Sequence, residues 1–205
     1  MSANSKPAPT AHFLEMYPDT FSRDFCESLI ARFEADPRKE ESRTAVRVNP
    51  KVRTGTMLSP QHISEWKDVI EAVERATYKN IEAYAEKYPS LMFLIKPENS
   101  YVTAPLMERI GPGQGYSFHI DAGPWGSHDR LLSTITYLRD VEEGGYTEFA
   151  FQNARVKPRA GAMLIFPPFW THLHRGAPPV REVKYNLTNY LVLWPKDEPA
   201  QTTVS

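Results

Sequence analysis

The feature that most constrains the fold is a succession of short β-prone runs after Pro89, with no helical segment between them. Glycine, proline and asparagine separate these runs, as is typical of turns between strands. Strands at such close spacing pair with one another in antiparallel sheets, so the pattern predicts a β-sandwich or a β-barrel. The predicted strands are Leu91–Ile95, Tyr101–Ile110, Tyr116–Asp121, Leu131–Leu138, Thr147–Phe151, Ala162–Phe166 and Tyr185–Trp194.

Two helices are predicted before this β-rich part. Between Ser22 and Glu34 the apolar residues recur at helical spacing, and Ser22 is a suitable N-cap. A second apolar stripe follows Ser59-Pro60, where proline is tolerated in the first turn, and continues to about Tyr88. We expect both helices to pack against the β-rich body.

Composition excludes several classes of protein. The 205 residues include 24 basic and 25 acidic side chains, so the formal charge of −1 gives no electrostatic attraction to nucleic acid. No apolar run reaches the roughly 20 residues of a membrane span, and the first residues contain no apolar stretch of a secretory signal. The single cysteine, Cys26, cannot form an internal disulfide, which predicts a reducing compartment such as the cytoplasm.

The segment His119-Ile120-Asp121 is the first candidate for chemistry. On a strand, residues two apart lie on the same face, so this imidazole and carboxylate form two thirds of a facial metal triad. A histidine two residues before an acid is common by chance in this composition. The motif therefore needs a third ligand from elsewhere in the chain.

A second cluster, His172-Leu-His174, lies about 55 residues downstream. In a barrel, strands so distant in sequence lie side by side, so either histidine can supply the third ligand. We expect His174 to end one strand and Lys184 to lie in its antiparallel neighbour. From Lys184 onward the alternation predicts one polar inward face, which needs a polar ligand; its members are Lys184, Asn186, Thr188 and Tyr190.

Taken together, these segments resemble the iron(II)/2-oxoglutarate-dependent dioxygenases, and within them the prolyl 4-hydroxylase-like group. The likeness covers most of residues 20–194. It is carried by Phe21–Ile30, Val52–Gly55, Gly111–Asp121, Leu132–Phe149, Val156–Phe166 and the spacing from His174 to Lys184. The resemblance implies a mostly β protein with N-terminal helices and a double-stranded β-helix (jelly-roll, cupin-like) core. We expect residues 1–11 to form a flexible arm and 12–205 a single domain, with helices over about 22–88 and the jelly-roll over about 90–195.

The resemblance also implies the site and the reaction. His119, Asp121 and His174 would hold Fe(II), Lys184 would pair with the distal carboxylate of 2-oxoglutarate, and the Tyr137 hydroxyl would help to seat that cosubstrate. With O₂, such an enzyme hydroxylates an unactivated C–H bond and releases succinate and CO₂, with ascorbate as reductant in vitro. The substrate would be a proline-like peptidyl residue, a free amino acid or another small metabolite.

Several alternatives remain open. His172 has the same strand parity as His174, and a cupin-type enzyme using both would not consume 2-oxoglutarate; His174 is preferred because it lies ten residues before Lys184. Arg109 stands where some relatives place a cosubstrate-binding tyrosine, and it either binds the same carboxylate or faces solvent. A non-catalytic jelly-roll that binds a metal or a small anion is the second functional hypothesis, and it needs no buried cation such as Lys184 to hold 2-oxoglutarate.

The candidate substrate residues are Arg53, Tyr116 and Trp125, with Arg130 beside them. Trp125 follows Asp121 in a glycine-rich loop and would either pack on substrate or cap the barrel. The expected partner is a small molecule or a peptide, with no nucleic acid and no membrane. The remaining tryptophans are assigned to the core or to helix packing; they are Trp66, Trp170 and Trp194.

Overall fold

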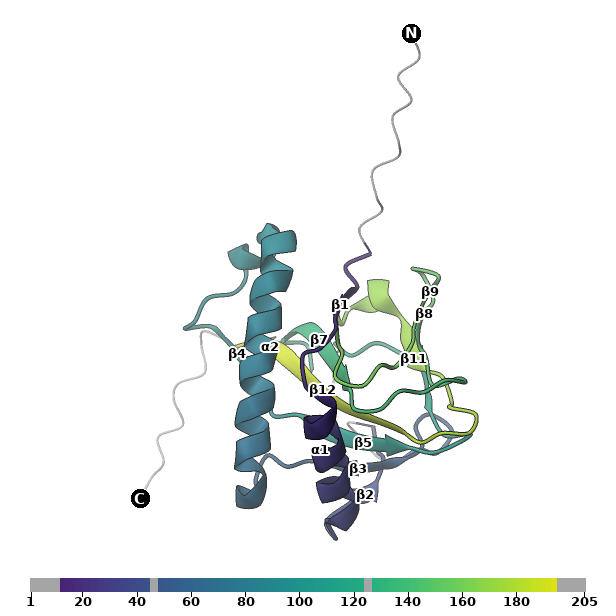
Figure 1. The fold of residues 1–205 in the computed structure, drawn as a ribbon. Coiled ribbons are helices and arrows are strands. Elements are labelled where there is room, and N and C mark those ends of the chain that lie inside the picture. Colours follow the sequence, from purple (N-terminus) through teal and green to yellow (C-terminus); the bar gives the residue numbers. More distant parts are fainter. Residues whose placement is uncertain (1–11, 45–47, 124–126, 195–205) are drawn as a thin grey trace.

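The structure, a computed structural model, describes residues 12–44, 48–123 and 127–194 (Figure 1). The predicted arm over residues 1–11 and the candidate Trp125 lie outside the described residues. Two antiparallel sheets and two α-helices make up the described part, with the helices on one side and the smaller sheet on the other (Figure 1).

The larger sheet has eight strands. Its order is β1 (Glu15–Tyr17), β10 (Met163–Phe166), β7 (Arg130–Tyr137), β12 (Lys184–Leu193), β5 (Leu106–Ile110), β3 (Thr56–Leu58) and β2 (Glu40–Glu41), and β4 (Ser100–Val102) also pairs with β12. The smaller sheet has four strands, in the order β6 (Tyr116–His119), β11 (His174–Gly176), β8 (Thr147–Phe149) and β9 (Ala154–Val156). Every pairing in both sheets is antiparallel.

The two sheets face each other across a shared core. Tyr137, Leu164 and Phe166 of the larger sheet form one buried cluster with Phe149 of the smaller sheet. This arrangement confirms the predicted mostly β, double-stranded β-helix architecture. It also places the inner faces of both sheets around the same interior.

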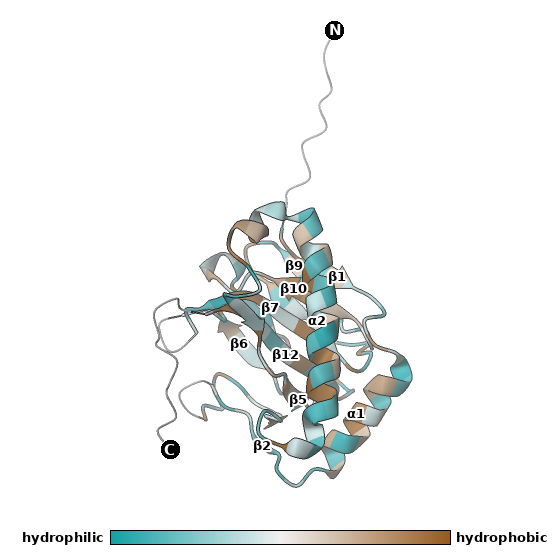
Figure 2. Ribbon diagram, turned by 90° about the vertical axis from the view of Figure 1, so that its left-hand side faces the viewer, coloured by the Kyte–Doolittle hydropathy of each residue, from teal (hydrophilic) through white to brown (hydrophobic). Residues whose placement is uncertain are grey.

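The helices cover the outer face of the larger sheet (Figure 2). Helix α1 (Arg23–Ala35) begins as predicted, with the Ser22 hydroxyl accepting a hydrogen bond from the backbone N–H of Phe25 at 3.2 Å. Cys26 is buried in the cluster that joins α1 and α2 (Lys67–Lys87) to the sheet. Neither helix, nor any other in the described ranges, combines the length and apolar character that crossing a bilayer requires.

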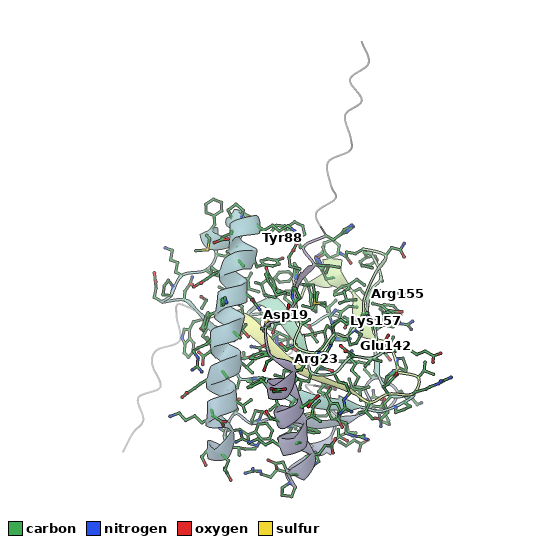
Figure 3. The ribbon with its side chains drawn as sticks, in the orientation of Figure 1. Asp19, Arg23, Tyr88, Glu142, Arg155 and Lys157 are labelled. Atoms are coloured by element: carbon green, nitrogen blue, oxygen red, sulfur yellow. The ribbon has the colours of Figure 1, made fainter. Side chains whose placement is uncertain are left out.

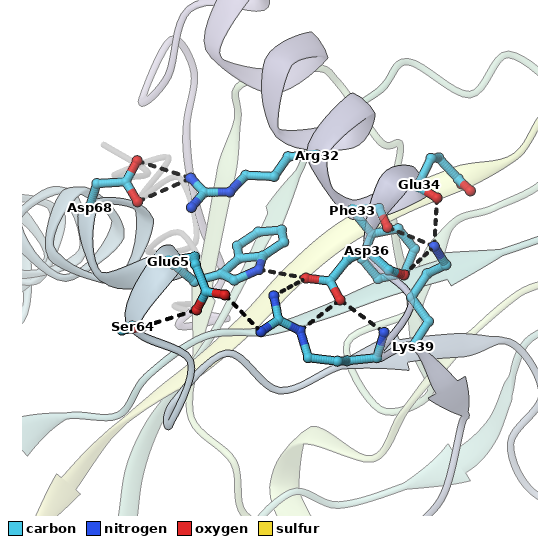
Figure 4. Close-up of polar contacts among 10 residues, drawn as sticks. Arg32, Phe33, Glu34, Asp36, Lys39, Ser64, Glu65 and Asp68 are labelled. Atoms are coloured by element: carbon cyan, nitrogen blue, oxygen red, sulfur yellow. Dashed lines mark hydrogen bonds and ion pairs between the residues drawn. The ribbon is translucent and has the colours of Figure 1, made fainter.

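Helix α2 begins later than the sequence predicts. Ser59-Pro60 opens a turn, and a short 3₁₀ helix, η1 (Ser64–Trp66), precedes α2. The delay has a physical cause, because Trp66 is 1% exposed and donates its indole N–H to Asp36 at 2.8 Å. Figure 4 shows the polar contacts around Asp36, which follows α1 directly. Its carboxylate accepts from Trp66, at the start of α2, and from Arg38, so these hydrogen bonds link the end of α1 to the start of α2.

Several local predictions were wrong. Leu91–Ile95 is not a strand; it overlaps the 3₁₀ helix η2 (Pro89–Phe93), whose i→i+3 backbone bonds satisfy the chain locally, and Phe93 is 87% exposed. The predicted strand Tyr101–Ile110 is two strands, β4 and β5, which pair with opposite ends of β12. Strands β1 and β9 were missed, because three residues are too few for an alternation to be recognised.

The tryptophan assignment was correct at one position of three. Trp66 belongs to the core, whereas Trp170 is 74% exposed and Trp194 is 56% exposed. Trp170 begins the short 3₁₀ helix η3 (Trp170–His172), and Trp194 directly follows β12 and packs against Tyr101. Both lie at ends of elements, where their hydrophobicity gives no indication of burial.

Gly161 joins the start of α1 to the barrel. Its carbonyl accepts a hydrogen bond from the backbone N–H of Phe21 at 3.1 Å, and its φ of 82° lies in the left-handed region. A Cβ atom at this position would overlap the Phe21 carbonyl oxygen. Both the backbone conformation and the close approach therefore require glycine here.

Candidate metal centre and cosubstrate pocket

The structure brings together the three residues predicted as metal ligands. His119 ends β6 and His174 begins β11, and the two are directly opposed in the smaller sheet. The Asp121 carboxylate lies 3.3 Å from His119 Nε2 through Oδ1 and 3.5 Å from His174 Nε2 through Oδ2. One donor atom from each residue lies within 4.8 Å of the other two. This is the mixture of imidazole and carboxylate that non-haem iron favours.

The tautomers of the two histidines suit a metal. Nδ1 of His119 lies 2.8 Å from the Ser117 carbonyl, and Nδ1 of His174 lies 2.9 Å from the His172 carbonyl. A carbonyl oxygen can only accept, so each Nδ1 carries the proton and each Nε2 presents a lone pair toward Asp121. Burial lowers the pKa of His174 to about 4, although attraction to Asp121 opposes this, so His174 is neutral at neutral pH.

The Asp121 carboxyl is ionised at neutral pH. Burial by itself would raise its pKa, but electrostatic interactions with His174 and His119 and the hydrogen bond from the Ser133 hydroxyl hold the pKa below its ordinary value. The Ser133 hydroxyl donates to Oδ2 at 2.7 Å and so fixes the orientation of the carboxylate. Sequence reasoning missed this role, although Ser133 lies four residues before Tyr137 in the same strand and so on the same face.

Lys184 occupies the interior, where a lysine is rare. Its side chain is 3% exposed, and its ammonium lies 5.4 Å from the centre of the Tyr137 ring. It forms no hydrogen bond or ion pair with any residue that the structure describes. Burial lowers the pKa of Lys184 to about 8, and the negative charge of Glu108 partly opposes the shift. The ammonium is therefore a buried cation without an anion in contact.

The expected relation between His174 and Lys184 was wrong. They do not lie in neighbouring strands: His174 is in β11 of the smaller sheet, and Lys184 is in β12, between β5 and β7 of the larger sheet. The chain between Gly176 and Lys184 passes from one sheet to the other. The ammonium and the histidine therefore line the same cavity from opposing walls rather than from one wall.

That cavity has a volume of about 710 Å³ and contains both the His119–Asp121–His174 cluster and Lys184. Its lining includes the polar inner face that the alternation of β12 predicted, namely Lys184, Asn186, Thr188 and Tyr190. Ile110 and Ile135 contribute apolar lining near these groups. Tyr137 is fully buried, and its hydroxyl shares a 2.7 Å hydrogen bond with Thr147, whose side chain lines the cavity.

The candidate substrate residues Arg53 and Tyr116 also line this cavity. The Tyr116 ring stacks on His119 with centroids 3.6 Å apart, and the Arg53 guanidinium lies over the same ring at 4.7 Å. Arg53 is not a surface residue, because it is ion-paired with the buried carboxylate of Glu108. Sequence reasoning missed Glu108, whose signal was a single acid within the apolar strand β5.

Arg130 lines the cavity as well, donating to the Asp121 carbonyl at 2.8 Å and lying 3.6 Å from the centre of the Tyr190 ring.

Two residues from the open alternatives lie elsewhere. His172 is on η3 rather than on a strand, and its ring is bonded to the His12 carbonyl and the Thr171 hydroxyl, so it is not one of the clustered donors. Arg109 points away from the cavity and pairs with Glu34 at 3.2 Å.

Residues 105–192, which include all the clustered groups, match the sequence model of the 2OG-Fe(II) oxygenase superfamily. The match covers this part of the chain only. Among curated proteins, a PKHD-type hydroxylase of Klebsiella pneumoniae is 36% identical over 92 residues, and a probable prolyl 4-hydroxylase of Arabidopsis thaliana is 33% identical over 107 residues. These alignments cover 40% and 38% of this chain and only 40% and 37% of the relatives' own lengths.

Solved oxygenase structures share the fold over a longer range. A viral collagen prolyl hydroxylase from Paramecium bursaria chlorella virus-1, in complex with 2-oxoglutarate, aligns with a TM-score of 0.65 and 19% identity, covering 87% of this chain and 95% of its own. A Trichoplax adhaerens prolyl hydroxylase, in complex with a peptide fragment of hypoxia inducible factor, aligns with a TM-score of 0.70 and 14% identity, covering 88% and 84%. These two alignments agree with the double-stranded β-helix fold described above.

Proposed function

We propose that residues 12–205 form a single Fe(II)- and 2-oxoglutarate-dependent dioxygenase domain. It hydroxylates an unactivated C–H bond of a proline-like peptidyl residue, a free amino acid or a small metabolite, and releases succinate and CO₂. The observation that supports this most strongly is the placement of His119, Asp121, His174 and Lys184 around one cavity.

The residues present fit both the metal and the cosubstrate. Two neutral imidazoles with Nε2 lone pairs and one ionised carboxylate are the donor set of a facial iron(II) site. A buried ammonium without an anion carries a desolvation cost, which a bound carboxylate would offset. A non-catalytic metal-binding jelly-roll would have no use for this cation, so Lys184 favours the enzyme.

Iron(II), 2-oxoglutarate and O₂ would supply the oxidative decarboxylation and the hydroxylation when bound. The chain supplies position and charge. His119 and His174 each hold their Nδ1 proton on a backbone carbonyl, which keeps Nε2 free as a ligand. Ser133 holds the Asp121 carboxylate in place, and Lys184 binds the far carboxylate of the cosubstrate.

Succinate formation tests this proposal directly. The purified protein is incubated with Fe(II), ascorbate, 2-oxoglutarate and O₂, and slow succinate release is expected even without a substrate. Asp121→Ala should abolish it, because two histidines alone retain iron poorly. Glu142→Gln is the matched control. Glu142 is exposed and pairs with Lys157, which is labelled beside it in Figure 3, and with Arg159. Absence of succinate from the wild-type protein, or undiminished release by Asp121→Ala, would contradict the proposal.

For partners and location, we propose a small-molecule or peptide substrate in the cytoplasm. The balanced formal charge of −1 speaks against a nucleic-acid substrate. Cys26 is buried and unpaired, as suits a reducing compartment.

A further inference from the structure

The two histidines of the cluster are held by different kinds of surroundings. His174 is 3% exposed and packs between Phe149 and Phe166 of the core, with ring centroids 5.6 and 4.8 Å away. His119 lies on a strand whose neighbouring side chains are partly exposed, and the aromatic ring that lies flat against it is Tyr116. Besides the bond from Nδ1 to the Ser117 carbonyl, the orientation of the His119 ring therefore depends on Tyr116 rather than on the core.

A β-bulge makes this contact possible. Residues three apart on a regular strand point to opposite faces. In β6, however, His119 pairs with His174 and Tyr116 pairs with Gly176, so three steps along β6 oppose two steps along β11. The extra residue turns Tyr116 to the same side as His119, and the rings stack at 3.6 Å with an interplanar angle of 14°.

Tyr116 is held in turn by Arg53. The guanidinium lies over the phenol ring at 4.7 Å, and the backbones of the two residues form an isolated β-bridge. Arg53 presents both Nε and Nη2 to Oε1 of Glu108, with Nε at 3.1 Å, and donates from Nη1 to the Arg43 carbonyl. The other oxygen of Glu108 accepts from Asn186 at 3.2 Å. Glu108 is thus the buried charge that fixes the plane of Arg53.

We propose that Glu108 is a positioning residue of the metal centre, acting through Arg53 and Tyr116 on the ring of His119. This inference rests on the proposed function, because it assigns His119 to the metal. Without the carboxylate, the buried guanidinium loses its partner and its fixed plane. The Arg53 guanidinium then no longer packs over the Tyr116 ring, and Tyr116 no longer holds the His119 ring in place. The His119 ring rotates, and its Nε2 no longer faces Asp121.

Metal affinity, rather than turnover, is the decisive measurement. Co(II) is titrated into the metal-free protein without 2-oxoglutarate, and binding is followed by the visible absorption of the ion. We expect Glu108→Gln and Tyr116→Leu each to weaken binding by about 10- to 100-fold, the usual effect of removing an outer contact of a metal ligand. The double variant should bind Co(II) no more weakly than whichever single variant has the lower affinity. Both changes interrupt the same series of contacts from Glu108 to His119, so their effects should not add.

Glu148→Gln is the matched control. Glu148 is also a poorly exposed glutamate in a strand, and it pairs with Arg155 and Arg175 on the side of β8 away from the cavity. Its loss should leave Co(II) affinity within about twofold of wild type, as expected for a residue that does not contact Arg53, Tyr116 or His119.

A second variant covers the case in which Glu108→Gln does not fold. Arg53→Met combined with Glu108→Met removes both charges, so neither is left buried alone, and such replacements are generally tolerated. It should fold and still lose Co(II) affinity. Wild-type affinity in Glu108→Gln or in this pair, or additive losses in the Glu108→Gln and Tyr116→Leu double variant, would overturn the inference. If the wild-type protein itself bound no metal, the proposed function would fail instead.

Discussion

Replacing Lys184 by methionine is expected to stabilise the metal-free protein at neutral pH while removing cosubstrate binding. Burial lowers the pKa of this lysine from 10.5 to about 8, even with the opposing attraction of Glu108. That difference corresponds to an unfavourable free energy of about 3 kcal/mol for the charged form in the fold. Methionine has a similar length and carries no charge. The upper limit of the gain is therefore about 3 kcal/mol, or about 6–12 °C in Tm for a domain of this size.

The pH dependence gives this prediction its sign. The unfolded chain binds the lysine proton up to a pH near 10.5, whereas the folded protein releases it near 8. Between these values the unfolded state holds more protons, so the free energy of unfolding of the wild-type protein rises with pH. The destabilisation is complete below about pH 8 and has disappeared above about pH 10.5. The advantage of Lys184→Met should shrink across this window.

Urea unfolding followed by circular dichroism, at several pH values and with the metal removed by EDTA, measures both effects. Lys67→Met is the control, because this lysine side chain is 79% exposed and its replacement should change little. With metal present in both samples, added 2-oxoglutarate should further stabilise only the wild-type protein. A Lys184→Met protein that is less stable than wild type at neutral pH, or that follows the same pH profile, would refute the reasoning.

Three further changes test other parts of the structure. Ser133→Ala removes the donor that orients Asp121 and should weaken metal binding by about tenfold in a titration; unchanged affinity would show that the carboxylate is held without it. Gly161→Ala should lower the free energy of unfolding by about 2–4 kcal/mol in urea, because of its positive φ and the overlap of a Cβ; a loss below about 0.5 kcal/mol would contradict this. Asp36→Ala leaves the indole N–H of Trp66 without its partner, so Tm should fall by an amount matching about 1–3 kcal/mol, and an unchanged Tm would argue against the network.

The sequence by itself determined the parts of this protein that follow from local periodicity. A strand repeats every two residues, so it aligned the inner face of β12 from Lys184 to Tyr190. The sequence also paired Asp121 with His119, although β6 ends at His119 and Asp121 lies in a bend just after it rather than on the predicted strand. Capping chemistry likewise located the start of α1 at Ser22. These features depend only on residues a few positions apart in the chain, so they can be predicted from the sequence.

Tertiary structure decided which distant residues meet. It selected His174 over His172, because the chain forms a 3₁₀ turn before β11 and so removes the shared parity of the two residues. It also set Lys184 on the wall opposite His174 and paired Arg53 with Glu108, 55 positions apart. Strand pairing, sheet crossing and the bulge in β6 are set by long-range packing, and local patterns of polarity carry no record of it.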